Sequence, residues 1–324
     1  MHDWQHAIAG GVLAVAVFLL ICGVTAPLST LVWRLRRRIN LADLKVALAL
    51  VTLLPLQVAV LVAFSFSLPS CVYQSGCYAG WLQHLFGAGF SLWMRPIAVF
   101  VGGILVVWIA RLVYRGASLI RTMCELYAHS HPPSPKLLTV LRQVVPQDWH
   151  SRFREVDMPS EADGVYGGTC LLSRETVGSL NEAQLKAVVA HEYQHLRAGD
   201  GWFALWVGLL VNSTALGIWN MAYRYWSRAA ELLADARAAQ SGVARTELAR
   251  ALLNRQAEAQ GMVLGFASEG ILLEERLQSL LASQPLKSSA RVTWVLIAVC
   301  VGGVLYLVSK VGAASTCTVH CVLF

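Results

Sequence analysis

The stretch Val188-Val189-Ala190-His191-Glu192-Tyr193-Gln194-His195 contains an HExxH motif. The apolar residues that precede His191 favour a helix with one buried face. On a helix, His191 and His195 lie one turn apart and point the same way, so both imidazoles can reach one metal ion. Zinc suits this pair, because a catalytic zinc takes three protein ligands and keeps one position open. Glu192 lies beside the first histidine and could accept a proton from water.

The limits of this helix can also be predicted. Ser179, with Glu182 three residues later, offers a capping box at the start, and Gly199 offers a stop at the end. The alternative interpretation is a pair of histidines on a solvated helix face. The flanking residues agree better with a buried helix.

The third zinc ligand is expected in the segment 228–235. Glu231 lies there on a second predicted helix, and Asp235 follows one turn later on the same face. Glu231 could bind zinc while Asp235 accepts a hydrogen bond from a ligating histidine. A carboxylate pair on a solvated surface is the alternative. Because an HExxH motif precedes the pair and zinc needs a third ligand, we predict one Zn²⁺ per chain, bound by His191, His195 and Glu231.

Together these residues resemble the membrane gluzincins. The HExxH motif is followed by Asp200, and Glu231 lies 40 residues after His191, a spacing similar to that of the BlaR/MecR-type receptor peptidases of beta-lactam resistance. The HtpX/Ste24 type is the nearest alternative. The resemblance implies a zinc metalloendopeptidase in which Asp200 and Asp235 support the ligands.

The composition predicts an integral membrane protein. Mean hydropathy is +0.55, 56% of residues are hydrophobic and 14% are charged. Four apolar segments, 7–26, 46–68, 96–114 and 292–309, have about the length of a transmembrane helix. A fifth apolar run, 201–220, is interpreted as a helix that does not cross, because one crossing there would separate Glu231 from His191.

Arginine placement gives the expected orientation. The first loop, around 34–38, and the segment after the third helix are rich in arginine, which places them and the active site in the cytoplasm. The N- and C-termini would then lie outside a bacterial cytoplasmic membrane. Four cysteines would also lie outside, where they could form disulfides: Cys71, Cys77, Cys317 and Cys321. This topology accounts for the net charge of +7 without nucleic acid.

The predicted fold class is an α-helical integral membrane protein with an inserted, mainly helical α+β zincin-like metallopeptidase domain. Three transmembrane helices would occupy 1–114, the peptidase domain 115–290, and the fourth helix with a short tail 291–324. A small sheet is expected around 153–173. Its stretch 164–172 is either an edge to which a peptide substrate adds or an ordinary hairpin.

The expected function is membrane-anchored zinc-dependent proteolysis of a protein or peptide substrate. The resemblance implies signal-regulated cleavage of a cytoplasmic repressor. The penicillin-binding sensor of those receptors has no counterpart here, since only about fifteen residues follow 309. The expected partners are therefore the lipid bilayer and a separate sensor protein. Membrane protein quality control of the HtpX type, and a non-catalytic zinc-stabilised receptor or scaffold, are the alternatives.

Overall fold

The computed structural model describes residues 18, 21–37, 39–67, 90–158, 163–213, 217–260 and 267–282. The elements named below are, in chain order, η1 (Leu35–Arg37), α2 (Leu41–Ser67), α4 (Phe90–Ala128), β1 (Ser130–His131), α5 (Pro135–Val144), η2 (Gln147–Arg152), β2 (Phe153–Val156), β3 (Gly164–Tyr166), β4 (Thr169–Ser173), α6 (Arg174–Ser179), α7 (Glu182–Ala198), α8 (Asp200–Ser213), α9 (Gly217–Gln240), α10 (Arg245–Gln260) and α11 (Ala267–Leu281).

A small sheet lies at one end of the molecule. Its order is β1-β2-β4-β3, with β2 and β4 parallel and the two outer pairs antiparallel. The apolar face of the sheet packs with α5 and α7 through fully buried side chains, among them Phe153, Leu172, Leu137 and Leu185. This core fixes α7 against the sheet, and the sheet expected around 153–173 is confirmed.

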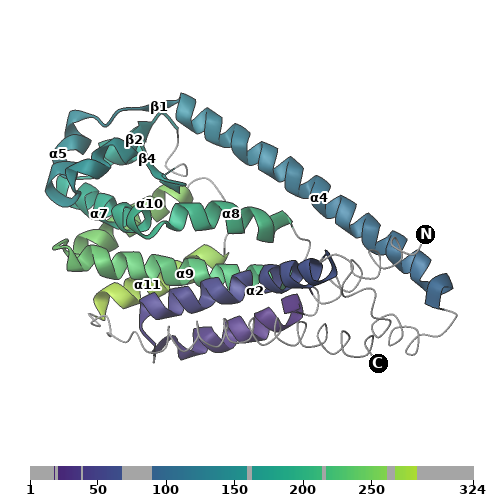
Figure 1. Ribbon diagram of the computed structural model, residues 1–324. Coiled ribbons are helices and arrows are strands. Elements are labelled where there is room, and N and C mark those ends of the chain that lie inside the picture. The colour runs from purple at the N-terminus through teal and green to yellow at the C-terminus, as the bar shows by residue number, and fades with distance from the viewer. Residues whose placement is uncertain are drawn as a thin grey trace, which may run out of the picture.

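A second core joins α2 to α9, and α11 lies along α9 as well (Figure 1). α9 contributes the small buried residues Ala222, Ala229 and Ala230, which leave room for the larger Leu44 and Leu48 of α2. The N-terminal part of the chain therefore packs directly on the helix that carries Glu231 and Asp235.

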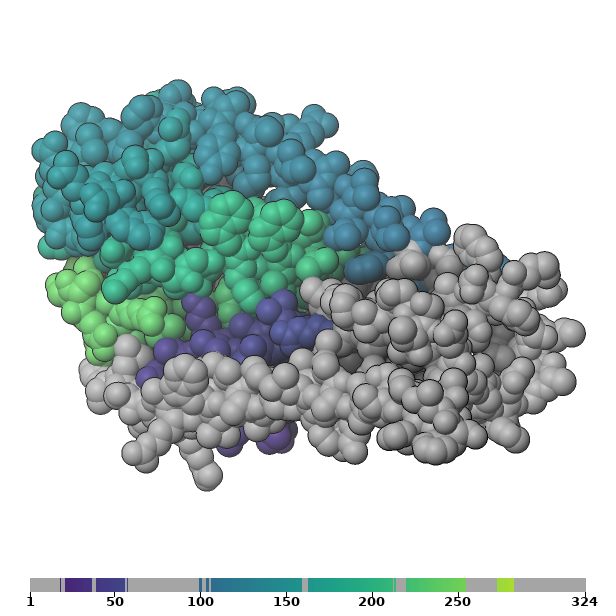
Figure 2. Space-filling model, viewed as in Figure 1, coloured from purple at the N-terminus to yellow at the C-terminus, as the bar shows by residue number. Residues whose placement is uncertain are grey.

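Helix α4 runs from the sheet past α8 and away from both cores (Figure 1). It contacts α8, where Trp108 Nε1 donates a hydrogen bond to Ser213 Oγ at 3.1 Å. In the space-filling view α4 lies along the upper right border of the molecule (Figure 2). At its last turns, Leu126 packs with Val156 and Leu171 of the sheet.

The prediction of four transmembrane helices is wrong. Within the part of the chain that the structure describes, no helix combines the length and the apolar run that a bilayer crossing requires. The predicted fold class is corrected to a mostly helical protein with one small sheet. The multi-pass location in a bacterial cytoplasmic membrane, with outer termini and a cytoplasmic active site, is overturned by the same finding.

The physical reason is visible in the second predicted span, 46–68. Its residues Leu48 and Val51 are buried against α9, so an apolar segment here serves a core between helices. Hydropathy measures how apolar a segment is and carries no information on what its side chains contact. The fourth predicted span, 292–309, and most of the first, 7–26, lie outside the described residues.

The interpretation of 201–220 as a run that does not cross stays a prediction. Its described residues belong to α8 and to the start of α9, and residues 214–216 lie outside the part of the chain that the structure describes.

Candidate metal centre

Helix α7 presents both histidines of the motif. Asn181 caps its N-terminus, and Asn181 and Gln184 form a reciprocal capping box. The predicted cap at Ser179 is therefore wrong, because Ser179 is the last residue of α6. Gly199 ends the helix as expected, in the left-handed conformation with φ 71°.

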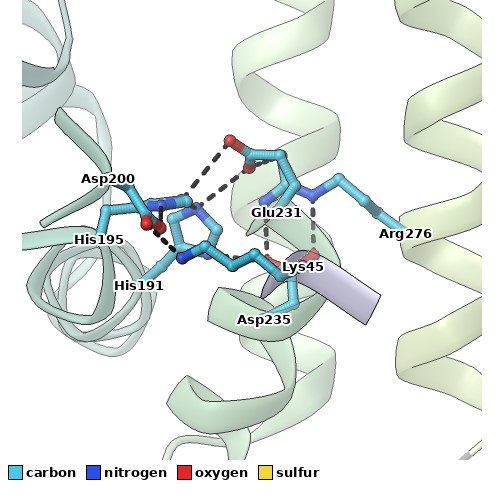
Figure 3. A network of polar contacts seen from close by, with 7 residues as sticks. All are labelled: Lys45, His191, His195, Asp200, Glu231, Asp235 and Arg276. Carbon is cyan, nitrogen blue, oxygen red and sulfur yellow. Dashed lines mark hydrogen bonds and ion pairs between the residues drawn. The ribbon is translucent and has the colours of Figure 1, made fainter. Parts of the chain in front are cut away.

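Helix α9 brings the two carboxylates to the same place. Glu231 and Asp235 lie one turn apart, and α9 packs against α7 through small residues such as Ala187, Ala190 and Ala238. His191 and His195 are buried, and the Glu231 side chain is about one quarter exposed. The structure thus brings together the three residues that the sequence proposed as ligands (Figure 3).

The donor atoms of these residues converge. His191 Nε2 lies 3.1 Å from His195 Nε2 and 3.3 Å from Glu231 Oε2, and His195 Nε2 lies 3.5 Å from Glu231 Oε1. Ligands about 2.0–2.1 Å from one tetrahedral zinc are roughly 3.3 Å from each other. The spacing and the nitrogen and carboxylate donors both fit Zn²⁺ without a change of side-chain position.

An aspartate lies behind each histidine. Asp200 Oδ2 accepts from His195 Nδ1 at 2.9 Å. Asp235 Oδ1 lies 2.8 Å from His191 Nδ1, within ion-pair distance, although the angle is outside that of a well-formed hydrogen bond. Contacts of this kind hold the proton on Nδ1 and leave Nε2 free to bind a metal.

A cation lies behind each aspartate (Figure 3). Lys45 of α2 forms an ion pair with Asp200. Arg276 of α11 binds Asp235 through two hydrogen bonds of 2.7 and 2.8 Å, and its guanidinium also lies 3.0 Å from Glu231 Oε2.

The charged residues around the two histidines oppose the effect of burial on the pKa values of the proposed ligands. Burial alone would lower the pKa of His195, but the charge of Glu231 and the hydrogen bonds that His195 makes to Asp200 and Glu231 raise that pKa to about 10. Burial would raise the pKa of Glu231, but the charges of Arg276 and His195 hold it well below its usual range. The field at the imidazole nitrogens therefore stabilises positive charge, which favours a proton or a metal cation alike.

Glu192 is buried beside the same cluster. Its side chain has partners of its own, and its charge contributes to raising the pKa of His195 and of Arg276. Glu192 thus acts electrostatically on the proposed ligand His195.

The β3–β4 hairpin borders the start of α8. β3 is the outermost strand on its side of the described sheet. A Cβ placed on Gly201 would lie 2.8 Å from Val165 O and 2.7 Å from Gly167 O, so only glycine permits this close packing. Addition of a peptide substrate to this edge stays a prediction.

Other candidates from the sequence lie elsewhere. The four cysteines that could form disulfides lie outside the described residues: Cys71, Cys77, Cys317 and Cys321.

Two residues of the centre were missed from the sequence, Lys45 and Arg276. Lys45 had a detectable signal, because it is the single basic residue in the apolar stretch 41–67, and a buried lysine needs a partner. Arg276 had none, since no spacing rule connects it with Asp235. Comparison with protein-family models, with curated proteins and with solved structures gave no match to this chain.

Proposed function

We propose that this chain is a zinc-dependent endopeptidase. The observation that carries the proposal is the convergence of His191, His195 and Glu231 at ligand spacing, with Glu192 next to the first ligand. Two buried histidines with supporting carboxylates match the needs of a catalytic zinc better than those of a solvated surface.

The residues divide the chemistry between them. His191, His195 and Glu231 would hold the ion, which supplies polarisation of a carbonyl and a lowered pKa of water when it is bound. Glu192 takes a proton from the attacking water as the water oxygen bonds to the peptide carbonyl carbon. As the carbon–nitrogen bond breaks, Glu192 passes that proton to the leaving amine.

The resemblance to the BlaR/MecR-type peptidases supports regulated cleavage of a repressor or other regulator. It rests on motif residues, and proteolytic quality control of the HtpX type uses the same chemistry. The substrate is in either case a protein or peptide.

A non-catalytic scaffold stabilised by zinc is the second candidate. The buried histidines join α7 to α9, which a structural zinc would also achieve. Glu192 favours the peptidase over the scaffold. A buried carboxylate beside the ligands is costly, and a purely structural zinc site does not require one.

The test is the Glu192→Gln variant of the full chain. We expect it to bind zinc like the wild type and to lose cleavage of an unfolded protein substrate such as casein by at least about 10²-fold, as for the loss of a general base. Glu182→Gln, the same change at an exposed position of α7, is the matched control. Zinc-loaded wild type that cleaves no protein or peptide, or equal cleavage by Glu192→Gln, would favour the scaffold.

A further inference from the structure

Each ligand histidine belongs to a chain of three groups that ends in a buried cation. One chain runs from His195 through Asp200 to Lys45, and the other from His191 through Asp235 to Arg276 (Figure 3). The cations come from α2 and α11, which are separated by more than 180 residues in the sequence. The Lys45 and Arg276 side chains are only 13% and 12% exposed.

From this arrangement we infer that Lys45 and Arg276 are positioning residues of the metal centre. Each holds the aspartate that orients one ligand histidine, so metal affinity depends on the placement of α2 and α11. The inference rests on the metal centre of the proposed function and extends it to residues outside the HExxH and Glu231 helices.

The first argument is the need of the aspartates for a partner. Asp200 and Asp235 are buried, at 6% and 1% exposed, and a buried carboxylate is costly without a compensating charge. A histidine that ligates zinc does so as neutral imidazole and provides no full charge. The compensating charge must therefore come from the far side of each aspartate, where Lys45 and Arg276 lie.

The second argument is the charge balance of these contacts. Lys45 contacts Asp200, and Arg276 contacts Asp235 and Glu231. These three carboxylates and two cations leave one negative charge in excess. Removal of either cation would raise that excess by one charge, next to an aspartate that is buried.

The two cations are not equivalent. Arg276 contacts both Asp235 and the ligand Glu231, which requires the planar fork of a guanidinium. Lys45 contacts Asp200 as a point charge and touches no ligand directly. Arg276→Lys should therefore fail to restore what Arg276→Met loses, whereas Lys45→Arg should restore part of what Lys45→Met loses.

The experiment measures zinc affinity of the purified full chain by competition with a chelator, together with the visible spectrum of the Co²⁺-substituted protein. We expect Lys45→Met and Arg276→Met to weaken zinc binding by about 10- to 100-fold, the usual effect of a group that supports a metal ligand. The cobalt spectrum should change as well, because the ligand geometry changes. Arg250→Met, at an exposed arginine paired with Glu247, is the matched control and should leave both readouts unchanged.

A double-mutant cycle separates positioning from general stabilisation. If Lys45 acts through Asp200, Lys45→Met should weaken zinc binding much less in an Asp200→Asn background than in the wild type. Additive losses, or variants that lose thermal stability but keep wild-type zinc affinity and cobalt spectrum, would overturn the inference. Wild type that binds zinc with this dependence but cleaves no substrate would refute the peptidase proposal alone.

Discussion

Helices α2 and α4 are the two long apolar helices of the described chain, with 27 and 39 residues, and they differ in what their side chains contact. On α2, Leu44 and Leu48 are fully buried in the core with α9. On α4, Val99, Phe100 and Tyr114 are 70% to 76% exposed.

The difference shows that an apolar helix contributes to a core only where another helix offers a matching surface. α9 offers small residues to α2, and this packing brings Lys45 to Asp200 at the candidate metal centre. α4 contacts α8 along part of one side, for example where Leu209 approaches Gly116. We therefore expect substitutions in α2 to affect both folding and the metal centre, and most substitutions in the exposed part of α4 to affect neither.

The largest effect is expected for Leu48→Ala. Truncation of a fully buried leucine leaves a cavity between α2 and α9 and should lower the free energy of unfolding by about 2–5 kcal/mol. Urea denaturation followed by circular dichroism measures this change. Val46→Ala on the partly exposed side of α2 is the control and should cost less than about 1 kcal/mol. Equal costs would show that the core with α9 contributes little.

The second largest effect is expected on removal of zinc, which should change hydrogen exchange in α2 but not in α4. If zinc binds as proposed, an ion concentration of 100 times its dissociation constant should stabilise the folded chain by about 2.7 kcal/mol, and chelation should remove that amount. Amides of α7, α9 and the part of α2 around Lys45 should then exchange faster with deuterium, because the proposed ion would join α7 to α9 and α9 packs on α2.

Amides of α4 between 104 and 120 provide the internal control of the same exchange experiment. Their exchange should stay unchanged on chelation, since α4 packs mainly with α8 and not with α7 or α9, which carry the proposed ligands. Equal acceleration in α2 and α4 would contradict a local role of the ion.

Much of the candidate site could be predicted from the sequence, because its signals are local. The HExxH spacing places His191 and His195 on one helix face, and the same one-turn rule pairs Glu231 with Asp235. Gly199 marked the helix end for a conformational reason. The start was misplaced because Ser179 and Asn181 are both good caps, and only the preceding helix α6 decides between them.

The rest depends on contacts between distant segments. Arg276 reaches Asp235 only because α11 packs on α9, and a sequence pattern does not report that packing. The error in fold class has the same origin. The apolar residues of α2 have the same hydropathy whether their side chains contact lipid or α9. Hydropathy predicted helices at the second and third segments, where α2 and α4 lie, and did not predict the packing of α2 on α9.

The smallest effect is expected on the exposed part of α4. Val107→Ala changes a side chain that is 59% exposed, so the free energy of unfolding should change by no more than about 0.5 kcal/mol. Leu126→Ala, on the same helix but 4% exposed and packed with Val156 and Leu171, is the matched comparison and should behave like a core substitution. Parallel urea titrations of the two variants measure the contrast. A large loss of unfolding free energy for Val107→Ala would mean that another surface covers Val107 in solution. α2 and α4 would then differ only in the surface that each helix packs against.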